Sequence, residues 1–205
     1  KDSMHRVKIL LLKILINLIS FLIRLNMTFI EEYNVPSSLC DKLIKYHQQN
    51  KEYKIVGTIG DAEVDLKVKD STDVLFYNDS THPTIIAFFN SLKTCIQDYV
   101  TKYLWGGHKI HTVTGNLIQH YKKGGGYKKL HYERSNLETA RRQLVYMLYC
   151  NTLKNGGTEF PLQNTTLQAT KGKLIIWPSD FTHPHKGVIS HTEEKYIVTG
   201  WFEII

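Results

Sequence analysis

The sequence predicts a single α+β domain in which helices come first and an antiparallel sandwich or barrel follows. The chain has 205 residues, of which 42% are hydrophobic and 22% charged, a composition typical of globular proteins. Apolar residues recur at helical spacing in the first half. After Gly106-Gly107, short runs rich in Val, Ile, Tyr and Thr alternate with Gly, Asn and Pro. Helices followed by evenly spaced strands indicate an antiparallel sheet structure with helices packed on one side.

The first 26 residues differ in composition from the rest. From residue 7 to residue 25 the chain is almost entirely Leu and Ile, interrupted by Lys13, and its longest uncharged stretch has only ten residues. A membrane-spanning helix needs about 20 apolar residues. Three interpretations stay open: a membrane anchor, a helix packed on the domain, or upstream sequence ahead of a natural start at Met27. In each case we expect an apolar segment at 1–26 and the working domain at 27–205.

Two segments ahead of the strands show helical periodicity. Residues 36–47 open with Pro-Ser-Ser, and Leu39 and Leu43 follow at a spacing of four, so we expect a helix with a serine cap. Apolar residues also recur at helical spacing from Pro83 to about Trp105, which indicates a long amphipathic helix. Between the two helices, residues 54–77 read as short β-like pieces broken by glycines.

The second half of the chain reads as a series of strands. Their Val, Ile, Tyr and Thr content and the turn residues between them are typical of strands. We expect seven, at residues 112–121, 127–133, 142–150, 166–170, 173–177, 184–189 and 195–204. No Pro/Ser-rich or low-complexity stretch interrupts them, so we expect no linker and no second domain.

The charge and the cysteine content bear on two classes of protein, nucleic-acid-binding proteins and proteins held by disulfides or structural zinc. The formal net charge is +7, but residues 1–26 hold five basic residues and one acidic residue, so more than half of the excess lies outside the expected domain. The basic charge is therefore no argument for a nucleic-acid partner. The three cysteines, Cys40, Cys95 and Cys150, show no CxxC spacing, which speaks against a disulfide framework or structural zinc and fits a reducing compartment.

Two His-x-acid pairs occur among the ten histidines. His131 and Glu133 end a predicted strand, where residues two apart project to the same face, so imidazole and carboxylate would point together into a barrel. His191 and Glu193 lie in a polar, turn-like stretch and are expected to be solvated. A second imidazole beside the first pair would complete the two-histidine, one-carboxylate face that holds Fe(II). The candidates for this imidazole are His183 and His185.

Six landmarks occur in order between about Asn116 and Phe202. They are Tyr121 ten residues before His131, Tyr149-Cys150-Asn151, Gly156-Gly157-Thr158-Glu159-Phe160-Pro161, Lys171-Gly172 leading to Trp177, His185-Lys186-Gly187, and Lys195 ten residues after His185. In this order and spacing the chain resembles the iron(II)- and 2-oxoglutarate-dependent dioxygenases. It is most similar to their prolyl 4-hydroxylase-like branch, which also occurs in bacteriophages and large viruses.

The resemblance implies a double-stranded β-helix (jelly-roll) core with supporting N-terminal helices. It implies Fe(II), 2-oxoglutarate and O2 as cofactors and ascorbate as the reductant. It favours His185 over His183 as the third metal ligand and leaves His183 as a neighbour of the ligands. By the same resemblance Lys195 holds the distal carboxylate of 2-oxoglutarate, Tyr149 helps to hold it, and Tyr121 lies near the chelating end.

One position departs from the family pattern. The usual acid is Asp, whereas this chain has Glu133, whose carboxylate extends about an ångström or more further, and metal sites are sensitive to such displacements. Some family members carry His-x-Glu, so we favour a working site. The alternative is a non-catalytic jelly-roll binding module that keeps the fold.

The resemblance implies an enzyme that hydroxylates an unactivated C–H bond, with a peptidyl proline as the expected target, and releases succinate and CO2. Another target, such as a nucleobase, is the second enzymatic alternative, although nucleobase demethylases typically use Arg where Lys195 stands. We expect a peptide or protein substrate and no nucleic-acid partner. A membrane partner is expected only if residues 1–26 are an anchor. The expected location is cytoplasmic, in the host cell if the protein is viral, with a membrane-anchored form as the alternative.

Overall fold

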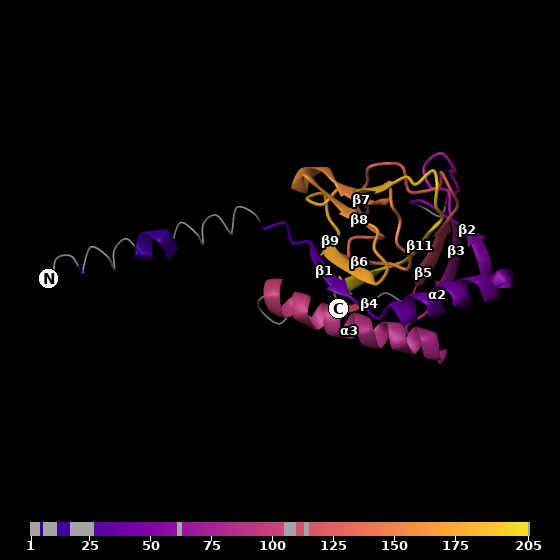
Figure 1. The fold of residues 1–205 in the computed structure, drawn as a ribbon, viewed down its shortest axis with the longest axis horizontal. Coiled ribbons are helices and arrows are strands. Elements are labelled where there is room, and N and C mark those ends of the chain that lie inside the picture. Colours follow the sequence, from indigo (N-terminus) through magenta and orange to yellow (C-terminus); the bar gives the residue numbers. More distant parts are fainter. Residues whose placement is uncertain are drawn as a thin grey trace.

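The computed structural model describes residues 5, 12–16, 27–60, 63–104, 110–112 and 115–204. Two antiparallel sheets form the core, and two long helices run along the outside of the larger sheet (Figure 1). The α+β class and the jelly-roll core are confirmed. Most of the apolar segment at 7–25 and the expected end of a helix at Trp105 lie outside the described residues. Within the described parts, no helix is both long and apolar enough to cross a membrane.

The larger sheet contains eight strands and the smaller one three. In spatial order, the larger sheet consists of β1 (Glu31–Asn34), β9 (Lys173–Pro178), β6 (Arg142–Tyr149), β11 (Lys195–Ile204), β5 (Asn116–Tyr121), β3 (Thr72–Phe76) and β2 (Lys54–Val56), with β4 (Ile110–Thr112) also paired to β11. The smaller sheet consists of β10 (Lys186–Val188), β7 (Gly157–Phe160) and β8 (Thr165–Gln168). The helices are α2 (Ser37–Gln49) and α3 (Pro83–Tyr103), with short 3-10 turns η1 (Lys51–Tyr53) and η2 (Pro161–Gln163).

Strand β6 shows how the larger sheet separates two hydrophobic cores. Successive side chains of a strand point to opposite faces. Tyr146 and Leu148 belong to the core under the helices, whereas Met147 and Tyr149 belong to the core between the two sheets. Both faces of β6 are therefore buried, and this explains why its sequence is apolar almost throughout.

Strand β11 uses the same alternation to place polar groups inside the barrel. Val198 packs under the helices and Ile197 between the sheets. Lys195 and Trp201 are an even number of residues from Ile197, so their side chains project to the same face of the strand, and both line the cavity between the sheets. The alternation thus places a lysine and a tryptophan in the interior of the barrel.

The helices support the outer face of the sheet, and one of them begins differently from the expectation. Helix α3 starts at Pro83, and the side chain of His82 caps it by accepting a 3.2 Å hydrogen bond from the Thr84 amide. The serine cap expected for α2 is wrong. Pro36, which has no polar side chain, occupies the cap position, and Ser37 is already the first helical residue.

The strand expected at 127–133 is also wrong, although it contains the His131 pair. This segment forms only isolated bridges, between Tyr127 and Lys69 and between His131 and His185. Its backbone partner changes every few residues, since the Glu133 amide donates to the Ser179 carbonyl. A continuous ladder with one partner strand therefore cannot form.

Other boundaries differ in smaller ways. The strand expected at 112–121 is two strands, β4 and β5, and the Gly-Gly-x-Thr motif forms β7, which was not expected as a strand. The pieces expected at 54–77 are β2 and β3.

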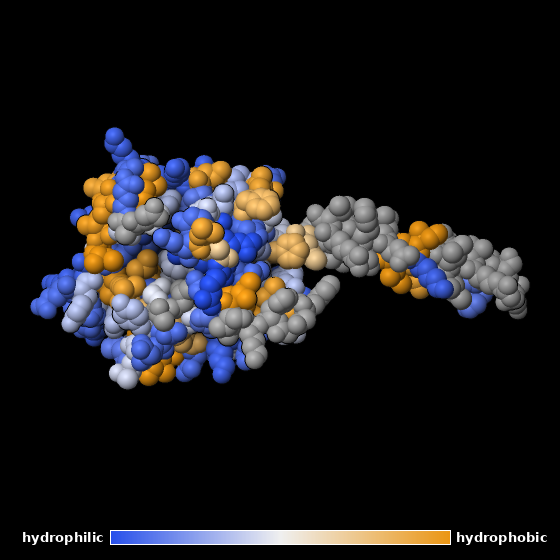
Figure 2. All heavy atoms as spheres, turned by 180° about the vertical axis from the view of Figure 1, so that it is seen from behind, coloured by the Kyte–Doolittle hydropathy of each residue, from blue (hydrophilic) through white to orange (hydrophobic). Residues whose placement is uncertain are grey.

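The surface seen from behind is a mosaic of hydrophilic and apolar side chains (Figure 2).

Candidate active site

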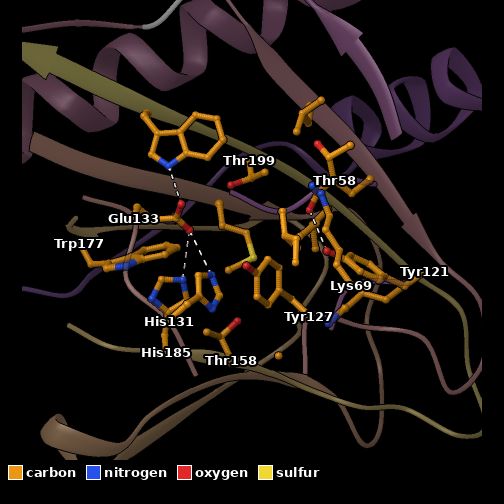
Figure 3. A pocket seen from close by; sticks show the side chains of 18 of the residues that line it. Thr58, Lys69, Tyr121, Tyr127, His131, Glu133, Thr158, Trp177, His185 and Thr199 are labelled. Atoms are coloured by element: carbon orange, nitrogen blue, oxygen red, sulfur yellow. Dashed lines mark hydrogen bonds and ion pairs between the residues drawn. The ribbon is translucent and has the colours of Figure 1, made fainter. Parts of the chain in front are cut away.

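A cavity of about 220 Å³ lies between the two sheets. Alternate residues of β5 and β11 form one wall, and the segment around His131 and His185 forms another. Residues 58–60 and Lys69, which precede β3, also contribute to the lining. The side chains that carry the predicted chemistry converge on this space (Figure 3).

His131, Glu133 and His185 come together in the cavity as the sequence predicted. Their ligand atoms all lie within 4.8 Å of one another. Oε1 of Glu133 lies 3.3 Å from Nε2 of His131 and 3.5 Å from Nε2 of His185. Two imidazole nitrogens and one carboxylate oxygen therefore face a common point, which is the donor set typical of Fe(II)-dependent oxygenases.

Backbone contacts fix the orientation of both imidazoles. Nδ1 of His131 donates to the Lys129 carbonyl at 2.9 Å, and Nδ1 of His185 donates to the His183 carbonyl at 3.0 Å. These bonds keep a proton on Nδ1 of each ring and direct Nε2 toward Glu133, so Nε2 is the nitrogen that can bind a metal. The ring of Tyr127 stacks on His131 at 3.8 Å between centroids, and the edge of Trp177 packs on His185.

The surroundings of Glu133 favour its ionised form. Burial alone would raise its pKa, but the hydrogen bonds and charges of His131 and His185 outweigh this effect and hold the pKa well below its usual range. The other carboxylate oxygen, Oε2, accepts a 3.1 Å hydrogen bond from the indole of Trp201 and lies 3.5 Å from Arg142. Sequence reasoning missed these two partners.

Lys195 is a buried cation without an anionic partner among the described residues. It is only 6% exposed, and in the described part of the chain its ammonium has no hydrogen bond or ion pair. Burial lowers its pKa from 10.5 to about 8. Its nitrogen lies 4.9 Å from the ring centroid of Tyr121. A Cβ at Gly187 would lie 3.4 Å from this nitrogen and 3.1 Å from the Tyr127 carbonyl, so the glycine of the His-x-Gly motif leaves room here.

The two predicted tyrosines occupy different positions. Tyr121 lines the cavity beside Lys195, and its hydroxyl donates to Gln119 at 2.9 Å. Tyr149 lies deeper in the core, and its hydroxyl bonds that of Thr158 at 2.6 Å. Thr158 in turn lines the cavity, so Tyr149 reaches the site through Thr158.

The remaining histidine candidates lie apart from the group. His183 is buried, and its Nε2 donates to the Thr28 carbonyl at 2.7 Å, which occupies the atom that would bind a metal. His191 is exposed, and Glu193 accepts from the Lys154 amide at 2.7 Å. Neither histidine belongs to the described group of converging ligands.

A second lysine of the cavity was missed by sequence reasoning. Lys69 is buried and forms a 2.8 Å ion pair with Asp73, which is buried as well. Gln119 donates to the same aspartate oxygen at 3.2 Å and accepts from Tyr121, so the ion pair continues into the wall of the cavity. Lys69 lies in a turn-rich stretch where a lysine is normally exposed, so no sequence pattern marks it.

Comparison with known proteins agrees with this geometry. Residues 117–203 match the family model described as the 2OG-Fe(II) oxygenase superfamily. No curated protein matches the chain in sequence. The viral collagen prolyl hydroxylase of Paramecium bursaria Chlorella virus-1, solved with 2OG, aligns with a TM-score of 0.68 and 18% identity, over 87% of this chain and 98% of that one.

Two further solved structures share the fold. A prolyl hydroxylase of Trichoplax adhaerens, solved with a peptide fragment of the hypoxia inducible factor oxygen degradation domain, aligns with a TM-score of 0.67 and 16% identity over 88% of this chain and 86% of that one. A prolyl-4-hydroxylase of Pseudomonas putida aligns with a TM-score of 0.66 and 15% identity, over 85% of this chain and 91% of that one.

A jelly-roll with two histidines and one carboxylate converging in its cavity defines the class of 2-oxoglutarate-dependent dioxygenases with a prolyl hydroxylase-like fold. The family match over residues 117–203 includes all three converging ligands and Lys195, and with the solved structures it supports a 2-oxoglutarate-dependent dioxygenase. The oxygenases that this family model describes use Fe(II) and 2-oxoglutarate.

Proposed function

We propose that residues 27–205 form a catalytic domain that hydroxylates a peptidyl proline, with 2-oxoglutarate and O2 as cosubstrates. The observation that carries this proposal is the convergence of three potential metal-ligand atoms within 4.8 Å of one another. The same cavity holds Lys195, which is buried and has no anionic partner among the described residues. His131, Glu133 and His185 are the proposed ligands of Fe(II). A group of residues that can bind a cation and a lysine that can bind an anion in one cavity fit a dicarboxylate that chelates the metal.

The donor set suits Fe(II). Nδ1 of each imidazole is bonded to a backbone carbonyl, so Nε2 is the nitrogen that can bind a metal, and Glu133 is held in its ionised form. All three donors line the cavity, which offers the space in which a keto acid and O2 would bind.

The buried lysine suits the distal carboxylate of 2-oxoglutarate. A buried, unpaired ammonium costs free energy, and an incoming carboxylate would remove that cost. Tyr121 flanks this position directly, and Tyr149 acts through the hydroxyl of Thr158. We assign Lys195, Tyr121 and Thr158 to cosubstrate binding and Tyr149 to positioning of Thr158.

When bound, iron and 2-oxoglutarate supply the activation of O2, with one oxygen atom passing to the substrate C–H bond and the other to succinate as CO2 leaves. The protein supplies orientation and exclusion of water. Trp177 and Tyr127 pack against the two imidazoles and keep them in place. Residues 58–60 and Lys69 cover part of the cavity.

A peptidyl proline is the proposed target because the Trichoplax relative was solved with a peptide and three relatives are named prolyl hydroxylases. The alternatives are another target such as a nucleobase, and a binding module without catalysis. The ionised, converging donor set around Glu133 favours an enzyme over a binding module.

Uncoupled turnover tests the enzyme. The protein is incubated with Fe(II), ascorbate as the proposed reductant, and 2-oxoglutarate labelled at the carboxyl carbon next to the keto group. We expect release of labelled CO2 and formation of succinate. Absence of release, together with a melting temperature that Mn(II) and 2-oxoglutarate leave unchanged, would show a binding module instead. A proline-containing peptide array read by mass spectrometry should gain the mass of one oxygen atom. Loss of the methyl group from methylated oligonucleotides, with no gain of oxygen on peptides, would favour the nucleobase alternative.

A further inference from the structure

The two carboxylate oxygens of Glu133 face different partners. Oε1 faces the two imidazoles, whereas Oε2 accepts a 3.1 Å hydrogen bond from Nε1 of Trp201 and lies 3.5 Å from Nη1 of Arg142. Figure 3 shows the Glu133 carboxylate directed at the imidazoles of His131 and His185. One oxygen is thus directed to the proposed metal position, and the other is held by the protein.

We propose that Trp201 and Arg142 form a clamp that positions Glu133 as a metal ligand in place of the shorter aspartate. This inference rests on the proposed function, because it concerns how the same site binds its metal. The clamp consists of positioning residues: each acts on the metal through Glu133.

A glutamate ligand needs such a clamp for geometric reasons. Its carboxylate stands about 1.5 Å further from the backbone than that of aspartate, and it has one more rotatable bond. Metal ligands tolerate deviations of only about 0.2 Å. Without contacts to Oε2, the Glu133 carboxylate could rotate away from the point that the imidazoles face.

Arg142 contacts Glu133 at both ends of the residue. Its Nη1 donates to the backbone carbonyl of Glu133 at 3.3 Å and also approaches Oε2. Its guanidinium lies over the ring of Trp201, at 3.9 Å from the centroid. The stacking holds both donors in one unit, because neither can turn without losing contact with the other.

The clamp is attached to two central strands of the larger sheet. Trp201 lies in β11 and Arg142 begins β6, and these are adjacent central strands of the larger sheet. Glu133, by contrast, lies in a segment without a continuous ladder. Contacts from the central strands therefore compensate for the irregular backbone that carries the ligand. Lys195 lies on the same strand as Trp201, so β11 supports both ends of the proposed cofactor site.

Binding of Mn(II) alone, measured from the electron paramagnetic resonance signal of the free ion, tests the clamp without relying on turnover. Trp201→Phe keeps an aromatic ring beneath Arg142 and removes the indole donor together with part of the ring area. We expect it to weaken Mn(II) binding about tenfold, the lower end of the effect seen when partners of metal ligands are changed. Arg142→Lys should also weaken binding, because it loses the flat guanidinium.

A double-mutant cycle separates positioning from general loss of structure. In the Glu133→Asp variant the carboxylate is too short to reach the indole, so adding Trp201→Phe should change Mn(II) affinity less than about twofold. Tyr99→Phe is the matched control. It removes one part-buried hydrogen bond, from Tyr99 of α3 to the Phe29 carbonyl, and should lower the melting temperature while Mn(II) affinity stays unchanged.

Equal losses from Trp201→Phe in the unchanged protein and in the Glu133→Asp variant, or no loss in either, would overturn the clamp. If Trp201→Phe does not fold, Arg142→Lys in the same two backgrounds gives the same decision. Failure of the unchanged protein to bind Mn(II) would instead overturn the proposed function, and the clamp with it. The two failures are therefore distinguishable.

Discussion

Lys195 on β11 lies directly opposite Tyr121 on β5, and its ammonium nitrogen stands 4.9 Å from the centre of the tyrosine ring. The pair joins the two strands at the end of the cavity, and neither side chain supplies a negative charge at neutral pH, since burial and then Asp73 raise the pKa of Tyr121 well above its usual value. The lysine is therefore left to pair with a bound anion.

The affinity for 2-oxoglutarate should fall as the pH rises above about 8. The pKa of Lys195 in the folded protein is lowered to about 8 by burial, so the ammonium is charged below this pH and loses its proton above it. Affinity should fall at most about tenfold per pH unit, because one proton is linked to binding. Anaerobic titration with Mn(II) present, from about pH 7 to about pH 9.5, measures this. Lys195→Arg stays charged and should remove the decline, and a flat profile for the unchanged protein would contradict the assignment.

Replacing Lys195 by Met should stabilise the protein while abolishing cosubstrate binding. A lysine whose folded-state pKa is lowered destabilises the folded state below about pH 8, and this cost disappears as the pH rises from 8 to 10.5. At pH 7 the gain in free energy of unfolding should be on the order of 3 kcal/mol at most. Urea unfolding at pH 7 and at pH 10.5 measures it, and the gain should shrink at the higher pH. A loss of stability at pH 7 would show that the ammonium has a partner in the folded protein.

The two histidines of the Thr-His-Pro-His stretch should respond differently to substitution. His185→Ala removes a proposed ligand and should abolish Mn(II) binding. His183→Ala should retain Mn(II) binding but lower the free energy of unfolding by about 1–3 kcal/mol, because it removes the bond to the Thr28 carbonyl from a buried site. Calorimetric titration and urea unfolding on both variants separate the roles. Loss of Mn(II) binding in His183→Ala alone would reverse the ligand assignment.

The proximity of His131 and Glu133 was predictable from sequence, although they do not lie on a strand. Spacing of two residues suggested a strand that directs His131 and Glu133 to one face. The structure instead holds His131 through a single bridge to His185, and Glu133 through its amide bond to Ser179. The ordered motifs were informative because their order and spacing along the chain could be compared with a known family.

The contacts of Trp201 and Arg142 with Glu133 could not be predicted in the same way. They depend on which residues of β6 and β11 lie opposite an irregular segment, and strand register between segments far apart in the chain leaves no local sequence pattern. Lys69 was missed for the same reason, since its burial depends on the position of the segment before β3. The position of Tyr121 beside Lys195 likewise follows from the register of β5 against β11.

Tyr149 should affect cosubstrate binding only through Thr158. Tyr149→Phe removes the hydroxyl that bonds Thr158 and should weaken 2-oxoglutarate binding a few-fold, about the value of one hydrogen bond. Thr158→Val should weaken it at least as much, because this hydroxyl lines the cavity. The double variant should be no worse than Thr158→Val alone. Independent, additive losses in titrations with Mn(II) present would place Tyr149 in direct contact with the cosubstrate.

The buried ion pair between Lys69 and Asp73 should be much more important for stability than an exposed pair. Asp73→Asn leaves Lys69 buried without a negative partner, which typically costs about 3–5 kcal/mol, whereas replacing both members by apolar residues costs much less. Urea unfolding of Asp73→Asn, and of the double variant Lys69→Met with Asp73→Leu, measures both effects. Lys171→Met is the matched control, because its partner Asp41 is largely exposed and the pair should contribute less than about 1 kcal/mol. Equal losses for Asp73→Asn and Lys171→Met would mean that water reaches the Lys69 pair in solution.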